Sequence, residues 1–111
     1  MPGGTTMASV SITRERGGRE VSFFVSGTFD RASAWRLRGE LEGVEGDLIV
    51  LDFTRAPDIS DLGLAVLAHG LTRAHHRIVC RGLRQHHLRV FRYCGVDLED
   101  EAEHESQGGL A

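Results

Sequence analysis

Apolar and polar positions follow two kinds of pattern along the chain, and the first kind predicts strands. Residues 10–13 alternate apolar and polar positions and residues 21–26 form an apolar-rich stretch, so both are predicted to be short strands joined by a glycine turn. Residues 48–53 are apolar almost without interruption, as is typical of a central strand buried on both faces. A shorter run at 78–80 predicts a fourth strand.

The second pattern, apolar residues three and four positions apart, predicts three helices. The first is expected at residues 30–43, with Ser33 as its N-cap. The second follows a Ser-Asp pair and reaches at least residue 73, and the third covers about 84–93. Glycines close the first and third of these segments, as is common after helices.

The predicted order is therefore β-β-α-β-α-β-α, within a chain of 111 residues, which suits one domain. Strands that alternate with helices predict an α/β fold with a mixed, mostly parallel sheet of about four strands, an antiparallel N-terminal edge strand and three or more helices. We expect residues 1–8 to be disordered, residues 9–98 to form the domain and residues 99–111 to form an acidic flexible tail.

The composition places the chain among globular proteins, with 41% hydrophobic and 26% charged residues. No apolar run approaches the ~20 residues of a membrane-spanning helix, so no membrane insertion is expected. The N-terminal residues have neither a basic region nor an apolar core, and two cysteines are too few for a disulfide scaffold. A cytoplasmic location is the resulting expectation.

Charge is distributed unevenly along the chain. Residues 97–105 contain six acidic residues and no arginine, whereas residues 62–96 contain six arginines and no acidic residue. Such a basic half suits either nucleic acid or an acidic protein partner, or is simply a solvated face. Because no aromatic residues or known binding motif accompany the arginines, nucleic-acid binding is the less favoured interpretation.

Motifs for enzymatic chemistry are missing. The chain has no lysine and none of the glycine-rich phosphate-binding or nucleophile-elbow motifs, so we expect no enzymatic activity and no cofactor. Two adjacent histidine pairs, 75–76 and 86–87, raise the question of a metal site. Adjacent residues on a helix point about 100° apart, so each pair is expected to offer at most one ligand. The prediction is therefore exposed histidines and no metal site.

The turn between the buried strand and the second helix is the strongest candidate site. Ser60 and Asp61 lie where the first helical N–H groups lack partners and the helix dipole is positive, so an anion there is stabilised. A hydroxyl at such a turn is also well placed for phosphorylation. The plainer interpretation is that one of the two residues is an N-cap. The two roles are compatible, and the residues alone do not choose between them.

Three motifs in order resemble the STAS domains, the bacterial anti-sigma factor antagonists. Residues 27–30 (Gly-Thr-Phe-Asp) resemble the Gly-Glu-Leu-Asp sequence that begins the first helix of that family. Residues 59–64 resemble the Asp-Ser-Ser-Gly-Leu turn, and Gly95-Val96 resembles the Gly-Leu pair after the last helix. The resemblance spans about residues 10–98 and implies a single STAS-like domain.

In that family, an anti-sigma kinase phosphorylates the first serine of the turn, and only the unmodified domain binds the anti-sigma factor. Alignment on Gly63 places Ser60 at the family's aspartate, Asp61 at the phosphorylated serine and Leu62 at the second serine. Either Ser60 receives the phosphate instead, or Asp61 is a fixed charge that partly mimics it. We favour the fixed charge.

The resemblance implies a non-enzymatic, anti-sigma factor antagonist-like domain in a partner-switching system. Its partner would be an anti-sigma factor and serine kinase of the histidine-kinase-like ATPase type, and homodimer formation stays open. Two alternatives are an accessory subunit of a lipid-transport ATP-binding cassette system and an arginine-rich nucleic-acid-binding module. The expected partner-binding residues are Thr28, Asp30, Arg31, Ser60, Asp61, Leu62 and Gly63.

Overall fold

The predicted order of strands and helices is confirmed by a computed structural model, which describes residues 10–73 and 76–99. Residues 1–8 and 100–111, expected to be disordered and flexible, lie outside the described residues. Within the described ranges, no helix is long and apolar enough to cross a membrane. The elements are β1 (Val10–Gly17), β2 (Glu20–Phe29), α1 (Arg31–Leu41), β3 (Leu48–Ile59), α2 (Asp61–Leu71), β4 (Arg77–Arg81) and α3 (Gln85–Tyr93).

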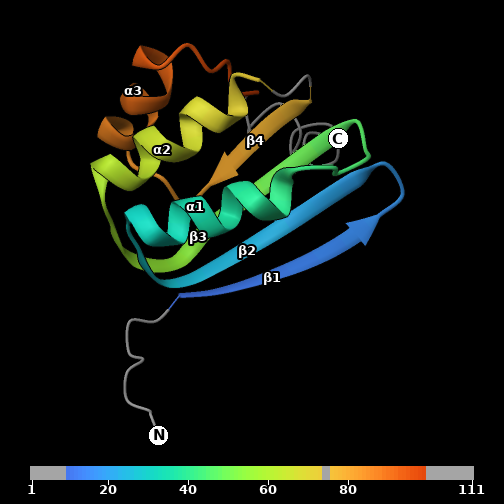
Figure 1. Cartoon of the computed structure of the whole chain (residues 1–111), viewed down its shortest axis with the longest axis horizontal. Helices are drawn as coiled ribbons and strands as arrows, with labels where there is room; N and C mark the ends of the chain where they lie inside the picture. Colours follow the sequence, from blue (N-terminus) through green and yellow to red (C-terminus); the bar gives the residue numbers. More distant parts are fainter. Residues whose placement is uncertain (1–9, 74–75, 100–111) are drawn as a thin grey trace, which may run out of the picture.

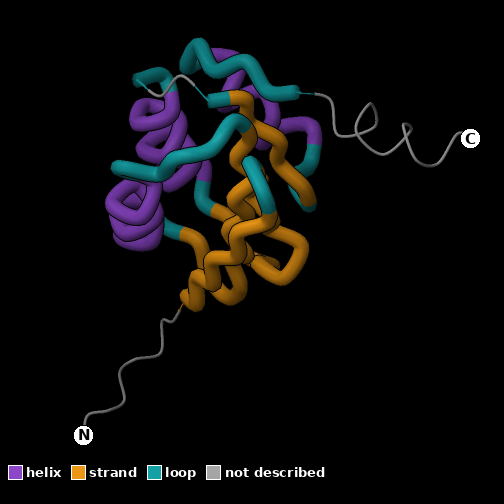
Figure 2. The backbone as a smooth tube through the Cα atoms, turned by 90° about the vertical axis from the view of Figure 1, so that its right-hand side faces the viewer, coloured by secondary structure: helices purple, strands orange, loops and turns teal. Residues whose placement is uncertain are grey.

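The strands form one mixed sheet in the order β1-β2-β3-β4. β1 pairs antiparallel with β2, whereas β2, β3 and β4 run parallel, so the predicted α/β architecture is confirmed. Helices α1 and α2 lie side by side on the same face of the sheet (Figure 1). A view turned by 90° shows helices packed along one side of the strand layer (Figure 2).

The core lies between this sheet and the helices. Ile49, Val50 and Leu51 of β3 are consecutive and all buried, which confirms a central strand covered on both faces. Phe29 and Phe53 meet edge to face in the core, with ring centroids 5.1 Å apart. This packing holds the end of β2, which α1 follows, against the middle of β3.

β3 is longer than predicted and continues six residues past Phe53 to Ile59. The local pattern hid this extension because residues 54–58 are mostly polar and include Pro57. Ser26 pairs with Arg55 and Thr28 pairs with Asp58, so β3 advances by three residues where β2 advances by two. The pairing of the two strands is therefore irregular here. Pro57 lies in this irregular stretch, where a missing N–H costs little.

Glu99 was expected to begin the flexible tail, and the structure instead attaches it to β4. Its backbone N–H donates to the Ile78 carbonyl at 2.7 Å. Its carboxylate accepts two hydrogen bonds of 3.1 Å from Arg77. The bound segment therefore extends at least to Glu99.

Candidate functional site

The N-termini of α1 and α2 meet at the edge of the sheet where β2 and β3 end. Phe29 and Ile59 are partners in the parallel register, so the two strands end side by side. The backbone N–H of Ser60 donates to the Phe29 carbonyl at 2.9 Å, which ties the second turn to the first. The carboxyl ends of parallel strands are where α/β folds commonly place their binding residues.

Gly63 allows the two helix starts to approach closely. A Cβ atom on Gly63 would lie 2.8 Å from the Asp30 carbonyl oxygen and 2.9 Å from its carbon, so only glycine fits without movement of the backbone. Thr28 pairs with Asp58 in the register just before these turns, and Arg31 is the exposed first residue of α1. The structure thus brings the seven sequence-predicted partner-binding residues to one edge of the sheet.

The N-cap of α1 is Asp30, so the prediction of Ser33 is wrong. The Asp30 carboxylate accepts the Ser33 backbone N–H at 3.0 Å, and the Ser33 hydroxyl lies 2.9 Å from the same oxygen. Ser33 is instead the third helical residue and is buried, with its hydroxyl 3.0 Å from the Thr28 carbonyl. The hydrogen bonds from Ser33, first the backbone one, lower the pKa of Asp30 below its ordinary value.

Ser60 is the N-cap of α2, which decides between the two candidate caps. Its hydroxyl accepts the Gly63 backbone N–H at 3.0 Å, and its backbone is extended. Asp61 is the first helical residue and is exposed, and the neighbouring Leu62 leaves 56% of its surface exposed. The α2 start therefore presents one carboxylate and one apolar side chain to solvent.

The N-terminus of α3 completes this region, and sequence reasoning missed it. Side-chain ligand atoms of Asp61, His86 and His87 all lie within 4.8 Å of one another. The two imidazole rings are 3.9 Å apart between centroids and inclined by 49°. Adjacent helical residues were expected to point about 100° apart, yet both rings of this pair have a nitrogen close to Asp61 of α2.

His87 also departs from the expectation of exposed histidines, since only 7% of its surface is accessible. The Arg84 backbone N–H lies 3.2 Å from its Nδ1 atom, which makes Nδ1 the acceptor. Burial, and next the neighbouring His86, lower the pKa of His87, and the Asp61 carboxylate partly opposes this shift. Neutral His87 is thus a fixed imidazole at the boundary between α2 and α3.

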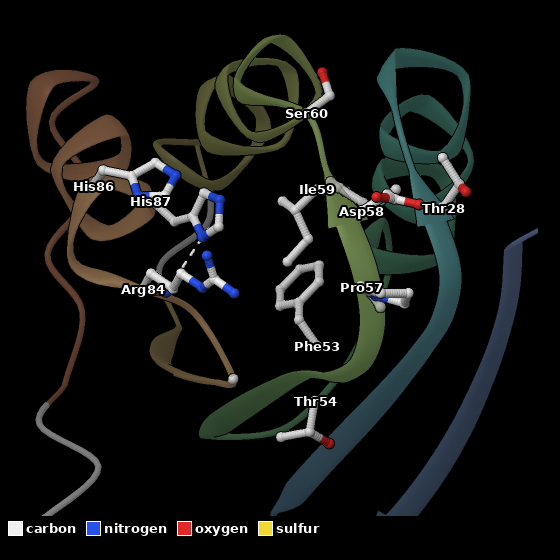
Figure 3. A pocket seen from close by; sticks show the side chains of 13 residues that line it. Thr28, Phe53, Thr54, Pro57, Asp58, Ile59, Ser60, Arg84, His86 and His87 are labelled. Atoms are coloured by element: carbon white, nitrogen blue, oxygen red, sulfur yellow. Dashed lines mark hydrogen bonds between the residues drawn. The ribbon is translucent and has the colours of Figure 1, made fainter.

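A cavity of about 530 Å³ separates the end of β3 from the start of α3. Arg84 and His87 lie on one side of it, opposite Phe53 and Ile59 of β3 (Figure 3). Gly82 sets this spacing because its φ is +83° and a Cβ atom there would lie 2.6 Å from the Thr54 nitrogen. Only a glycine lets the loop before α3 pack this closely on β3.

No local signal in the sequence joins α3 to this site. The turn residues are found by their place after a buried strand, but His86 and His87 follow a different strand and a different loop. Only the packing of α3 beside α2 brings them to Asp61.

Comparison with known proteins gives a consistent picture of the chain. Residues 12–98 match a family model described as "Mlab, STAS domain". No match was found among curated proteins.

Solved structures with a similar fold include three anti-sigma factor antagonists. The unphosphorylated form of SpoIIAA is 17% identical with a TM-score of 0.61, covering 90% of this chain and 97% of its own. An anti-sigma factor antagonist from Mycobacterium paratuberculosis is 17% identical with a TM-score of 0.64, and the match covers 90% of this chain and 94% of that protein. The STAS domain of an antisigma-factor antagonist from Rhodobacter sphaeroides is 25% identical with a TM-score of 0.53. This match covers 66% of this chain and 86% of that domain.

Proposed function

The chain belongs to the STAS domain family, and we propose that it acts as an anti-sigma factor antagonist-like interaction domain in a partner-switching system. In this role it is a regulatory binding protein of the cytoplasm and not an enzyme. The observation that carries the proposal is the exposed pair Asp61 and Leu62, held where the starts of α1 and α2 meet. An exposed leucine beside a charge is suited to binding a protein surface.

The engagement of Ser60 supports Asp61 as a fixed charge in place of the family's phosphoserine. The Ser60 hydroxyl already accepts a hydrogen bond as the N-cap of α2, so a phosphate there would have to replace a structural contact. Asp61 lies in the first helical turn, where the dipole of α2 stabilises its carboxylate. A carboxylate carries one negative charge where phosphoserine carries about 1.5 to 2, so the mimicry is partial, and we expect the domain still to bind its partner, unlike a phosphorylated antagonist.

The partner that fits this surface is an anti-sigma factor and serine kinase of the histidine-kinase-like ATPase type. Leu62 supplies apolar contact area, and Asp61, Arg31 and Thr28 add exposed charged and polar groups at the same edge of the sheet. A partner surface with a hydrophobic recess and a nearby cation would complement them.

Charge reversal at Asp61 tests the docking surface. In a pull-down against candidate anti-sigma kinases, Asp61→Lys should weaken binding at least ~10-fold, because it places a cation where the partner meets an anion. Glu40→Lys is the matched control, since Glu40 is exposed near the opposite end of α1. Equal binding by wild type and Asp61→Lys would show that the surface is wrongly assigned.

Intact mass after incubation with the cognate kinase and ATP tests the fixed charge. The wild type should keep its mass, whereas Asp61→Ser should gain one phosphate because it restores a hydroxyl at the family's acceptor position. A phosphate on the wild type that disappears in Ser60→Ala would instead make Ser60 the acceptor.

A second candidate is an accessory subunit of a lipid-transport ATP-binding cassette system. The description of the matched family model names Mlab and no anti-sigma factor antagonist. The family match is therefore also compatible with this second function. Affinity purification from the native cell separates the two. An ATP-binding cassette protein held through Asp61 and Leu62 would select the transport role.

A further inference from the structure

We propose that Asp61, His86 and His87 form a binding site for a divalent metal ion of the zinc class. The three residues come from the starts of α2 and α3, and their ligand atoms lie within 4.8 Å of one another. Two imidazole nitrogens and one carboxylate oxygen are a donor set typical of Zn²⁺, Co²⁺ and Ni²⁺. Mg²⁺ and Ca²⁺ prefer oxygen ligands, so they fit this set poorly.

The cluster needs only small side-chain movements to close around an ion. Zinc lies ~2.0–2.2 Å from nitrogen and oxygen ligands, so ligand atoms in a formed tetrahedral site are roughly 3.4 Å apart. His87 is buried and keeps its position, while Asp61 and His86 are exposed and can rotate toward it. Three protein ligands leave a fourth position for water or for a side chain of a partner.

His87 must give up one hydrogen bond to bind the ion. A neutral imidazole has a single nitrogen with a free electron pair, and in His87 this is Nδ1, which faces the Arg84 N–H at 3.2 Å. An ion at Nδ1 displaces that N–H directly. An ion at Nε2 requires the ring proton to move from Nε2 to Nδ1, which also breaks the contact. The contact is long, so its loss opposes ion binding only weakly.

The charges around the cluster limit its affinity. The starts of α2 and α3 carry partial positive charge, and Arg84 is close to His87, so both oppose a cation. The Asp61 carboxylate supplies the only negative charge among the three proposed ligands. We therefore expect a dissociation constant on the order of micromolar. At this affinity the occupancy of the site depends on how much metal is available, and the site is not permanently saturated.

Ion binding would also change the docking surface, a consequence that rests on the proposed function. A bound cation neutralises Asp61 and ties the start of α3 to the start of α2. If the partner recognises the free carboxylate, the ion competes with it. If a partner side chain takes the fourth ligand position, the ion bridges the two proteins. Either way, partner binding becomes dependent on the metal ion.

A zinc titration of the full, untagged chain tests the site without any partner. Competition with a chromogenic chelator should give one zinc ion per chain, and Asp61→Asn and His86→Ala should each weaken binding at least ~10-fold. Both residues are exposed, so these variants should fold, and circular dichroism checks this. His69→Ala is the matched control, because His69 is exposed on α2 outside the cluster and its loss should have no effect.

Co²⁺ gives an independent readout, since its visible absorption reports the number and type of ligands. Wild type should show a spectrum of nitrogen and oxygen ligation that is lost in His86→Ala. Absence of saturable zinc binding, or equal losses in His69→Ala and His86→Ala, would overturn the site and leave only adventitious surface binding.

Pull-downs with zinc and with chelator separate this inference from the proposed function. If zinc binds but partner binding is the same with zinc and with chelator, the metal site is supported and its regulatory role is wrong. A positive titration together with equal partner binding by Asp61→Lys and wild type would keep the site and overturn the docking surface. A failed titration with partner binding that depends on Asp61 would overturn the metal site alone.

Discussion

The starts of α2 and α3 lie next to each other but are built in opposite ways. α2 begins with a serine whose hydroxyl caps it and an aspartate that suits its dipole. In α3, all of which the structure describes, the first turn has no acidic residue, and its start is held by the contact between Arg84 and His87. Both starts are therefore held by a local contact, but the cap residue accepts the hydrogen bond at α2 and donates it at α3.

This comparison explains the division of roles in the candidate site. A locally capped helix can present Asp61 and Leu62 to solvent without losing its start. The start of α3 contributes His87, which is fixed by its contact with Arg84 and by burial beneath the surface. The site thus combines an exposed charge with a buried imidazole that only packing can place.

The largest expected effect comes from the glycines that hold the two starts in place. Gly82→Ala should lower the free energy of unfolding by about 3 kcal/mol, because it adds a Cβ at positive φ and 2.6 Å from the Thr54 nitrogen. Gly63→Ala should lower the free energy of unfolding by about 2 kcal/mol, because the added Cβ would clash with the Asp30 backbone. Urea denaturation measures both values.

Gly39→Ala is the control for these two variants. Gly39 lies inside α1 with nothing within 4 Å of an added Cβ, so alanine should stabilise the protein by up to about 1 kcal/mol. If Gly63→Ala were as stable as Gly39→Ala, the close approach of α1 and α2 would be wrong.

An intermediate effect is expected at the local cap of α2. Ser60→Ala should lower the free energy of unfolding by about 1 kcal/mol because the Gly63 N–H loses its partner. Ser60→Asn should recover most of this loss, since asparagine caps helices equally well. The measurement is again urea denaturation, and no recovery with asparagine would mean that the hydroxyl acts other than as a cap.

The smallest expected effect is a pH dependence at the cap of α1. The pKa of Asp30 is lowered in the folded state from 3.8, so its carboxylate stabilises the fold above that pH. The stabilisation should disappear as the pH falls below 3.8 and through the lower folded pKa. Thermal unfolding on acidification should show this loss in the wild type and a flatter profile in Asp30→Asn, which caps without titrating. Identical profiles would contradict the assigned cap.

The sequence by itself determined the order of the elements and the position of the principal turn. The unbroken apolar run before Asp52 predicted a strand buried on both faces, and the structure confirms this at Ile49 to Leu51. The same run located Ser60 and Asp61 at the start of the next helix. These features follow from local hydrophobic periodicity, which neighbouring residues encode.

Only the tertiary structure decided how far β3 extends, which residue caps α1 and what lies beside Asp61. The polar end of β3 is a strand because β2 pairs with it, and Ser33 is buried because Asp30 already caps the helix. His86 and His87 reach Asp61 because α3 packs beside α2. Each outcome depends on contacts between residues distant in sequence or on a choice between competing hydrogen bonds, and hydrophobic spacing along the chain encodes neither.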